Sequence, residues 1–312
     1  MVDFPKVESN GTIKETTLGS GDKAFTIGGE SAYPFHTFEG KMPHAPKLAM
    51  EVWDIAPSEW ATELNVVFGD VYQDPVAWAK RCVELGADAV MLTLASTDPN
   101  GNNAPAAQAV ETVKKVSKEI RSPLIVWGVE NDAKDGETLR AVAEAIDDRP
   151  LVLGPVVEGN YKQVGAGAIG YKHFVVANSP IDINLAKQLN ILLGNLGVKD
   201  QYVLMDPSVG GLGYGLEYTY SVMERARQAA LTQGDDKLQF PLFCNVGKEV
   251  WKTKEAKTSE QQEPTWGVAK TRGIAMEAMT TVAFLLSGAD LVVIRHPETL
   301  KTVRQYLAEM MQ

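Results

Sequence analysis

The stretch PVAWAKRCVELGADAVMLTL, residues 75–94, contains one complete unit of the fold. Its first eleven residues have the apolar spacing of an amphipathic helix, and Gly86 follows where a helix end favours a left-handed residue. Residues 89–94 are a short apolar run, which is typical of a parallel strand that helices cover on both faces. The stretch therefore predicts a helix followed by a buried parallel strand.

The same unit recurs along the chain. SGADLV at residues 287–292 repeats the helix-to-strand connection LGADAV at residues 85–90. Strands are predicted at 48–53, 89–94, 123–127, 151–156, 173–177, 202–205, 241–243 and 290–294. Helices are predicted at 75–85, 104–120, 136–146, 161–168, 181–196, 215–231, 267–286 and 298–310. Eight strand–helix units favour an α/β fold of the (β/α)8 TIM-barrel type over residues 47–312.

Two segments lie outside this repeat. Residues 1–46 form a predicted N-terminal extension, with a β-hairpin of 23–27, a Gly28-Gly29 turn and 31–35. Residues 248–264 are polar and rich in lysine, and they follow the seventh predicted strand. We interpret them as a solvated loop, or alternatively as a lid or partner contact beside the active face of the barrel.

The composition of the 312 residues excludes several classes of protein. Thirty Lys and Arg residues against 40 Asp and Glu residues give a net charge of −10. This acidic balance argues against nucleic-acid partners and against docking on anionic membranes. The chain starts with MVDFP, unlike a secretory signal, and no apolar run reaches the roughly 18 residues of a membrane span, so we expect a cytoplasmic protein. Cys82 and Cys244 are too few for a disulfide framework or a four-cysteine cluster, and both are expected to be buried.

Polar residues at the carboxyl ends of the predicted strands mark the expected site, because TIM barrels bind ligands there. They are Asp54, Thr93, Ser96, Asp98, Glu130, Asn131, Glu158, Asn160, Asn178, Asp206, Ser208, Asn245, Arg295 and His296. No lysine lies at any of these strand ends, which argues against a Schiff-base aldolase. Four histidines without a His-x-His pair make a histidine-ligated metal site improbable. His173 is expected to be structural, and His296 to cap the last helix or to act at the mouth.

Two further readings start from small groups of residues. Glu130, Glu158 and Asp206 could together hold Mg²⁺ in a metal-assisted lyase, although no lysine or histidine base is well placed for such chemistry. The glycine-rich run at 209–215 has no lysine and matches no nucleotide fingerprint. Its glycines allow a large flat ligand or another chain to approach the backbone closely.

Four stretches of the chain resemble a known family. They are ADAVMLTLASTDPN at 87–100, MDPSVGGLGYGLEY at 205–218, PFH at 34–36 and EVWD at 51–54. With them the sequence resembles, over essentially its whole length, the small subunit of the corrinoid iron–sulfur protein. This is the delta-type subunit of the acetyl-CoA decarbonylase/synthase system.

The resemblance implies a barrel that pairs with a larger subunit carrying a [4Fe–4S] cluster and a corrinoid domain. The implied heterodimer carries a methyl group on cobalt, from methyltetrahydrofolate and its methyltransferase to the nickel cluster of acetyl-CoA synthase/CO dehydrogenase. The chain would form one wall of the shared cobamide site without supplying a ligand to cobalt, since it lacks the Asp-x-His-x-x-Gly motif. It is not expected to be active alone, and we assign it no catalytic or metal-binding residue.

Neutral amides and small hydroxyls at the strand ends suit the carboxamides at the edge of a corrin ring. The expected corrinoid contacts are Ser96, Asn131, Asn178, Ser208, Gly210, Gly211 and Asn245. A pterin-binding methyltransferase barrel remains an alternative. In that reading, Asp54, Asn131, Asp206 and Asn245 would hold the pterin ring.

Overall fold

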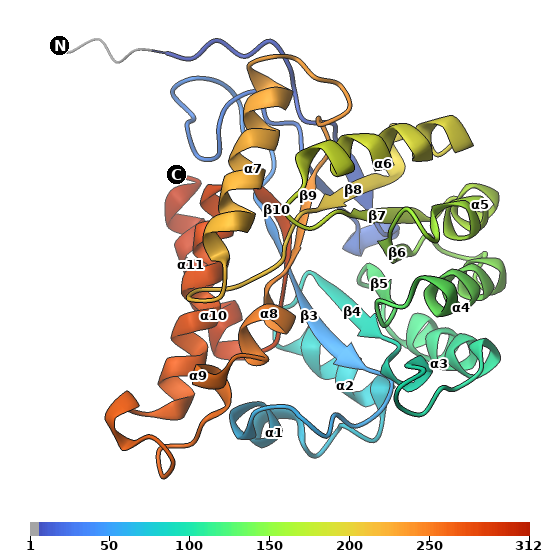
Figure 1. Cartoon of the computed structure of the whole chain (residues 1–312), viewed down its shortest axis with the longest axis vertical. Helices are drawn as coiled ribbons and strands as arrows, with labels where there is room; N and C mark the ends of the chain where they lie inside the picture. Colours follow the sequence, from blue (N-terminus) through green and yellow to red (C-terminus); the bar gives the residue numbers. More distant parts are fainter. Residues whose placement is uncertain (1–5) are drawn as a thin grey trace.

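Eight parallel strands close into a barrel in the computed structural model, which describes residues 6–312. The strand order around the barrel is β10-β3-β4-β5-β6-β7-β8-β9, so that the last strand pairs with the first (Figure 1). The strands are β3 (Lys47–Trp53), β4 (Ala89–Thr93), β5 (Leu124–Trp127), β6 (Val152–Val156), β7 (Phe174–Asn178), β8 (Val203–Asp206), β9 (Leu242–Asn245) and β10 (Ala289–Ile294). The predicted TIM barrel is confirmed.

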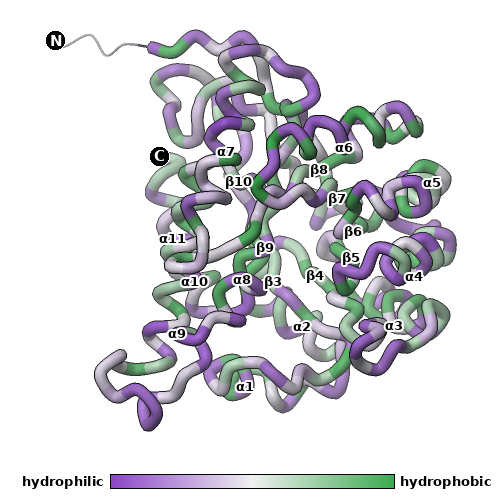
Figure 2. Tube along the Cα trace, viewed as in Figure 1, coloured by the Kyte–Doolittle hydropathy of each residue, from purple (hydrophilic) through white to green (hydrophobic). Residues whose placement is uncertain are grey.

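Helices surround the barrel, and hydrophobic and hydrophilic residues alternate along them (Figure 2). The eight that follow the strands are α2 (Pro75–Glu84), α3 (Ala106–Glu119), α4 (Asp132–Ala145), α5 (Tyr161–Tyr171), α6 (Ile183–Leu196), α7 (Leu216–Leu231), α10 (Ala269–Leu286) and α11 (Pro297–Met310). Gly86, Gly197 and Gly288 have φ angles of 99°, 105° and 104°, as predicted for the residues that follow helices. No helix in the described part of the chain combines the length and hydropathy needed to cross a bilayer.

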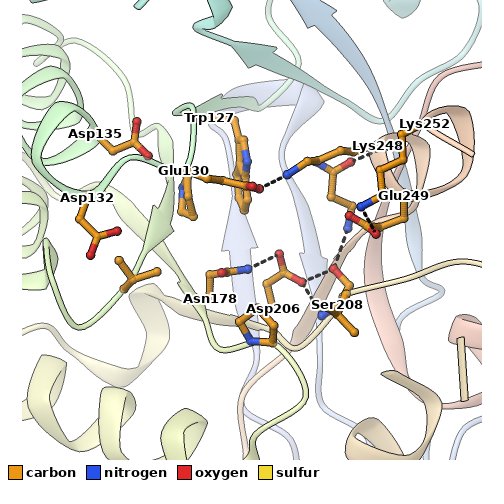
Figure 3. A pocket seen from close by; sticks show the side chains of 15 residues that line it. Trp127, Glu130, Asp132, Asp135, Asn178, Asp206, Ser208, Lys248, Glu249 and Lys252 are labelled. Atoms are coloured by element: carbon orange, nitrogen blue, oxygen red, sulfur yellow. Dashed lines mark hydrogen bonds and ion pairs between the residues drawn. The ribbon is translucent and has the colours of Figure 1, made fainter. Parts of the chain in front are cut away.

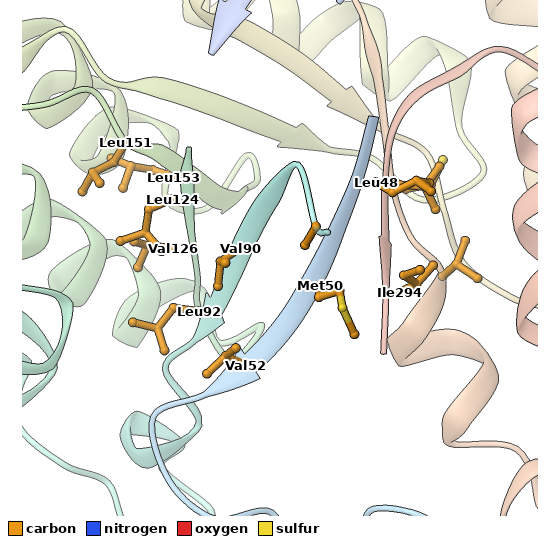
Figure 4. Close-up of a cluster of buried hydrophobic side chains, with 14 of the residues drawn as sticks. Leu48, Met50, Val52, Val90, Leu92, Leu124, Val126, Leu151, Leu153 and Ile294 are labelled. Atoms are coloured by element: carbon orange, nitrogen blue, oxygen red, sulfur yellow. The ribbon is translucent and has the colours of Figure 1, made fainter. Parts of the chain in front are cut away.

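Successive strand residues point alternately outwards and inwards, which creates two hydrophobic cores. Leu48, Met50 and Val52 face the helices, where they pack with other outward-facing strand residues (Figure 4). Ala49, Met91, Ile125, Trp127 and Phe243 fill the interior of the barrel. Both faces of the sheet are therefore buried, which explains the continuous apolar runs in the sequence.

A β-hairpin in the N-terminal extension closes the amino-terminal end of the barrel. It consists of β1 (Thr16–Leu18) and β2 (Phe25–Ile27), and Leu18 and Ile27 join the interior core. The predicted hairpin is correct in its strand at 25–27 but wrong in its turn and its partner, because β2 pairs with the segment before it. Segment 31–35 forms bends and turns.

The glycine pair at 28–29 explains this error. Both glycines have positive φ angles, and the amide of Gly29 donates to the carbonyl of Ile13. A Cβ on Gly28 would lie 2.1 Å from the carbonyl oxygen of Lys14. The pair therefore turns the chain against residues 13–15 and does not connect two strands.

The polar segment at 248–264 is largely folded. The helix α8 (Val246–Trp251) follows β9 directly, and α9 (Lys254–Lys257) and a 3₁₀ turn (Pro264–Trp266) come after it. Trp251 and Ala256 are buried, and the indole of Trp251 packs against Gly273 of α10. The reading as a solvated loop is therefore wrong for its first half, where buried side chains fix two short helices.

Candidate functional site

The carboxyl ends of the strands carry a polar layer inside the barrel. Each of its side chains lies two positions beyond a residue of the interior core, on the same face of its strand. The members of this layer are Glu51, Thr93, Asn178, Asp206, Asn245 and Arg295. All are buried except Asn178, which is half-buried. Buried polar side chains need a hydrogen-bond partner in the protein or on a ligand. In one half of the mouth they are paired with each other, and in the other half they surround an open pocket.

One half of the mouth, above strands β5–β9, contains a pocket of about 280 Å³. Figure 3 shows its side chains arranged around Asp206 at the floor, with Trp127 and Glu130 on one side and Lys248 on the other. The pocket is lined by Trp127, Glu130, Asp132, Asp135, Pro155, Val157, Asn178, Pro180, Asp206, Ser208, Val209, Asn245, Lys248, Glu249 and Lys252.

Asp206 is almost completely buried and is held by its neighbours. Its Oδ1 accepts hydrogen bonds from the amide of Ser208, at 2.9 Å, and from the Ser208 hydroxyl. Its Oδ2 accepts one from Asn178 Nδ2 at 3.0 Å. Burial raises the pKa of Asp206 to about 7, although these hydrogen bonds act in the opposite direction. Asp206 can therefore gain or lose a proton close to neutral pH.

Asn245 and Trp127 bring further polar hydrogens to the pocket. Asn245 Oδ1 accepts from the amide of Lys248, whereas its Nδ2 has only the sulfur of Met91 nearby, at 4.0 Å. The Trp127 ring stacks on Phe243 at 5.2 Å, and its buried Nε1 has no hydrogen-bond partner among the described residues. The Asn245 N–H group, whose side chain lines the pocket, is available to an acceptor on a ligand.

An ion pair between Lys248 and Glu130 lies at the rim of the pocket (Figure 3). Glu130 follows β5 with a left-handed backbone, at φ 62°, and Lys248 projects from the first turn of α8. The expectation that no lysine is well placed at the mouth is therefore wrong. Lys248 is not at a strand end, and it reaches the pocket from a helix.

The other half of the mouth, above β10, β3 and β4, is closed by side chains. Arg295 Nε donates to Glu51 Oε2 at 2.5 Å, and Glu51 Oε1 accepts from Thr93 and Trp53 at 2.8 Å each. The Arg295 guanidinium also lies over the ring of Trp60, 4.4 Å from its centre. The charged side chains of this half are thus paired with each other and packed against an aromatic ring. The open pocket is confined to the other half.

A family model described as the CO dehydrogenase/acetyl-CoA synthase delta subunit matches residues 15–305. The chain belongs to this delta-subunit family. It is 33% identical to the acetyl-CoA decarbonylase/synthase complex subunit delta of Archaeoglobus fulgidus, over 96% of the chain and 69% of that relative. The corresponding subunit of Methanopyrus kandleri is 34% identical, over 93% of the chain and 72% of the relative. The resemblance read from the sequence is confirmed.

Solved structures with the same fold include dihydropteroate synthases. The enzyme from Xanthomonas albilineans, in complex with indole-2-carboxylic acid and 6-chloroguanine, has a TM-score of 0.62 at 14% identity, covering 95% of this chain and 98% of that one. The enzyme from Vibrio fischeri has a TM-score of 0.59 at 11% identity, covering 95% and 99%. At these identities, the likeness shows that the delta-subunit barrel shares their fold.

Of the seven residues expected to contact a corrinoid in this delta-family chain, the structure gathers three in the pocket: Asn178, Ser208 and Asn245. Ser96 lies elsewhere at the mouth, where its amide donates to Asp54 at 2.9 Å. The exposed Asn131 caps α4 by accepting from the amide of Lys134. Gly210 and Gly211 are buried in the loop before α7 and do not line the pocket.

The residue sets of the two alternative readings are not brought together. Of the pterin set, Asp206 and Asn245 line the pocket, whereas Asp54 and Asn131 do not. Of the metal set, Glu130 and Asp206 line it and Glu158 does not. Within residues 6–312, no cluster of three or more acidic, histidine or cysteine side chains could hold a metal ion. The three carboxylates that could hold Mg²⁺ in the lyase reading are therefore not brought together.

Two histidines, His173 and His296, and both cysteines of this delta-family chain are buried. His173 Nδ1 accepts from the amide of Leu151 at 3.0 Å, as expected for a structural histidine. His296 caps α11, its Nδ1 accepting from the amide of Glu298, and burial lowers its pKa to about 4. Cys82 and Cys244 are buried and unbonded, as predicted.

Proposed function

We propose that the chain forms one wall of a cobamide site in a methyl-carrying heterodimer. The larger subunit would carry the corrinoid domain and a [4Fe–4S] cluster. The heterodimer would take methyl groups from methyltetrahydrofolate through its methyltransferase and deliver them to acetyl-CoA synthase/CO dehydrogenase, in the cytoplasm of an anaerobic cell. Membership of the delta-subunit family supports this role, as do relatives named as subunits of the acetyl-CoA decarbonylase/synthase complex.

The donor set of the mouth fits a corrinoid, and this observation carries the proposal. No histidine or cysteine lines the pocket, whereas Asn178 and Asn245 offer neutral amides. When bound, the corrinoid would supply a cobalt ion that accepts and donates a methyl group. An imidazole or thiolate beside the cobalt would coordinate its oxidised form. Amides hydrogen-bond the carboxamides at the corrin edge without competing for the metal.

The size of the pocket explains why a partner is needed. About 280 Å³ is at the small end of the range for drug-sized ligands, so this pocket can enclose only part of a corrin macrocycle. The rest of the mouth is filled by Arg295, Trp60 and their neighbours. A second subunit has to cover the opposite face of the ring before most of its surface is buried.

The cysteines support the assignment of the cluster to the partner. A [4Fe–4S] cluster needs four thiolates, and the full sequence contains two cysteines. Cys82 lies in α2 and Cys244 in β9, both buried, and burial raises the pKa of each thiol. Neither side chain is therefore an accessible thiolate.

Co-purification tests the proposal. The tagged chain would be expressed in an anaerobic host together with the larger subunit and purified without oxygen. We expect a heterodimer with about one cobalt per pair and iron in the ratio of one [4Fe–4S] cluster. A pair that forms but contains no corrinoid after incubation with hydroxocobalamin would contradict the proposal.

A further inference from the structure

The carboxylate of Asp206 has one free position for a hydrogen bond. An ionised carboxylate accepts about four hydrogen bonds, and Asp206 accepts three, two on Oδ1 from Ser208 and one on Oδ2 from Asn178. Figure 3 shows the carboxylate at the pocket floor between Asn178 and Ser208, directed towards the Lys248–Glu130 pair. The fourth position is therefore on Oδ2, where a ligand in the pocket could donate to it.

Unused N–H groups surround this acceptor. Asn178 Nδ2 has two hydrogens and gives one to Asp206. Asn245 Nδ2 has only a sulfur contact at 4.0 Å, and the buried Trp127 Nε1 has no partner within residues 6–312. A carbonyl oxygen next to an N–H on the ligand would satisfy both the donors and Asp206.

The charge of the lining selects against anions. Five acidic residues line the pocket, Glu130, Asp132, Asp135, Asp206 and Glu249, against two lysines, Lys248 and Lys252. Lys248 pairs with Glu130 and Lys252 with Glu249. A carboxylate or phosphate would meet this acidic surface without a free cation, whereas a neutral amide would not be repelled.

We infer that the pocket above Asp206 is a subsite for the planar edge of a neutral amide. The N–H of this edge donates to Asp206 Oδ2, and its carbonyl accepts from Asn178 and Asn245. The inference rests on the proposed function, since a corrinoid has such amides around its ring. The lactam edge of a reduced pterin methyl donor has the same chemistry, so the ligand group has two sources that an experiment can distinguish.

The proton on Asp206 makes binding depend on pH. Burial raises its pKa to about 7, and the ionised form is the stronger acceptor for the N–H of an amide. The charged groups that line the same pocket are Glu130, Asp132, Asp135, Lys248, Glu249 and Lys252, while Asn178, Ser208 and Asn245 are neutral. Burial raises the pKa of Asp135 to about 6, so Asp135 and Asp206 both change charge near neutral pH, and the Asp206→Asn variant separates their contributions. The affinity should fall as the pH drops below about 7.

Calorimetric titrations of the chain and of its heterodimer test the inference, with hydroxocobalamin and 5-methyltetrahydrofolate as separate probes at pH 6, 7 and 8. In Asp206→Asn, an NH₂ group faces the ligand N–H. We expect at least one probe to lose tenfold or more in affinity in this variant and to lose most of its pH dependence between pH 7 and 8. The control is Asp22→Asn, which removes one negative charge from an exposed residue of the N-terminal hairpin, outside the pocket, and should change the affinity less than twofold.

The pattern of losses identifies the source of the amide. Loss for hydroxocobalamin assigns the pocket to a corrin side chain, and loss for methyltetrahydrofolate assigns it to the methyl donor. If Asp206→Asn does not fold, Asn178→Ala removes a donor from a half-buried position and should weaken the same probe. The inference fails if the heterodimer binds hydroxocobalamin and both probes are unaffected by these variants, a result that leaves the proposed function intact. If the heterodimer binds no corrinoid at all, the proposed function itself fails.

Discussion

Arg295 donates its Nε hydrogen to Glu51 Oε2 at 2.5 Å, and this ion pair joins the last strand of the barrel to the first. Both side chains are more than nine-tenths buried. Glu277 on α10 fixes the backbone that follows β10, because its carboxylate accepts hydrogen bonds from the amides of Arg295 and His296. The seam where the barrel closes is therefore also the closed half of its mouth.

Removing the charge of Glu51 should destabilise the barrel strongly. Glu51→Gln leaves the Arg295 guanidinium buried without a counter-charge, which costs about 3–5 kcal/mol. Glu119→Gln, which breaks the exposed pair with Lys80, is the control and should cost less than about 1 kcal/mol. Urea denaturation measures both values. Equal losses for the two variants would show that the seam does not depend on this pair.

Glu30 should make the stability fall at higher pH. Burial and the neighbouring Asp290 raise the pKa of Glu30 well above its usual value. A carboxyl with a raised pKa in the folded state contributes stability below its unfolded pKa, and this contribution disappears as the pH rises through the folded pKa. Glu30→Gln should therefore flatten the dependence of the urea midpoint on pH above 5. The control Asp22→Asn, at an exposed position, should leave this dependence unchanged. If the urea midpoint of Glu30→Gln changed with pH as steeply as that of the unmodified protein, Glu30 would not have this role.

Gly28 should tolerate no side chain. Gly28→Ala places a Cβ 2.1 Å from the carbonyl oxygen of Lys14 and requires φ of +85°. The control Gly21→Ala also requires a positive φ, of +66°, but its Cβ meets no atom within 4 Å. We expect a loss of about 1 kcal/mol for Gly21→Ala from backbone strain alone and at least 2 kcal/mol more for Gly28→Ala. Similar melting temperatures for the two variants would contradict the proposed packing.

The iron content of the heterodimer should not depend on this chain. A Cys82→Ala, Cys244→Ala double variant removes both thiols, which are buried and free. The pair assembled with this variant should keep the iron and acid-labile sulfide of the unmodified pair. Loss of about four irons per pair, with the variant still folded and assembled, would place a cluster ligand here.

The barrel could be predicted because its signals are local. The connections at residues 85–90 and 287–292 each combine a glycine of positive φ with the start of a buried strand, and both features depend on neighbouring residues only. The N-terminal hairpin was harder to predict. β1 has three residues, and it is fixed by the insertion of Leu18 into the barrel, a contact with residues distant in the sequence.

The site was predicted in part for a similar reason. Asn178 and Asn245 are the last residues of β7 and β9, so strand ends alone place them at the mouth. Lys248 reaches Glu130 from α8, 118 positions later in the chain, and Trp127 faces inwards because of the strand register. Ser96 and Asn131 follow strands too, but Ser96 pairs with Asp54 and Asn131 caps a helix. Competition between local hydrogen bonds and a ligand cannot be read from position in the sequence.

Gel filtration with hydroxocobalamin tests the central claim, the shared corrinoid site, most directly. The isolated chain and the heterodimer would each be run without oxygen after incubation with excess cofactor. We predict that red absorbance elutes stoichiometrically with the heterodimer and that the isolated chain retains little, because its pocket encloses only part of a corrin ring. Stoichiometric corrinoid on the isolated chain, with an affinity equal to that of the heterodimer, would contradict the account and indicate a self-contained corrinoid protein.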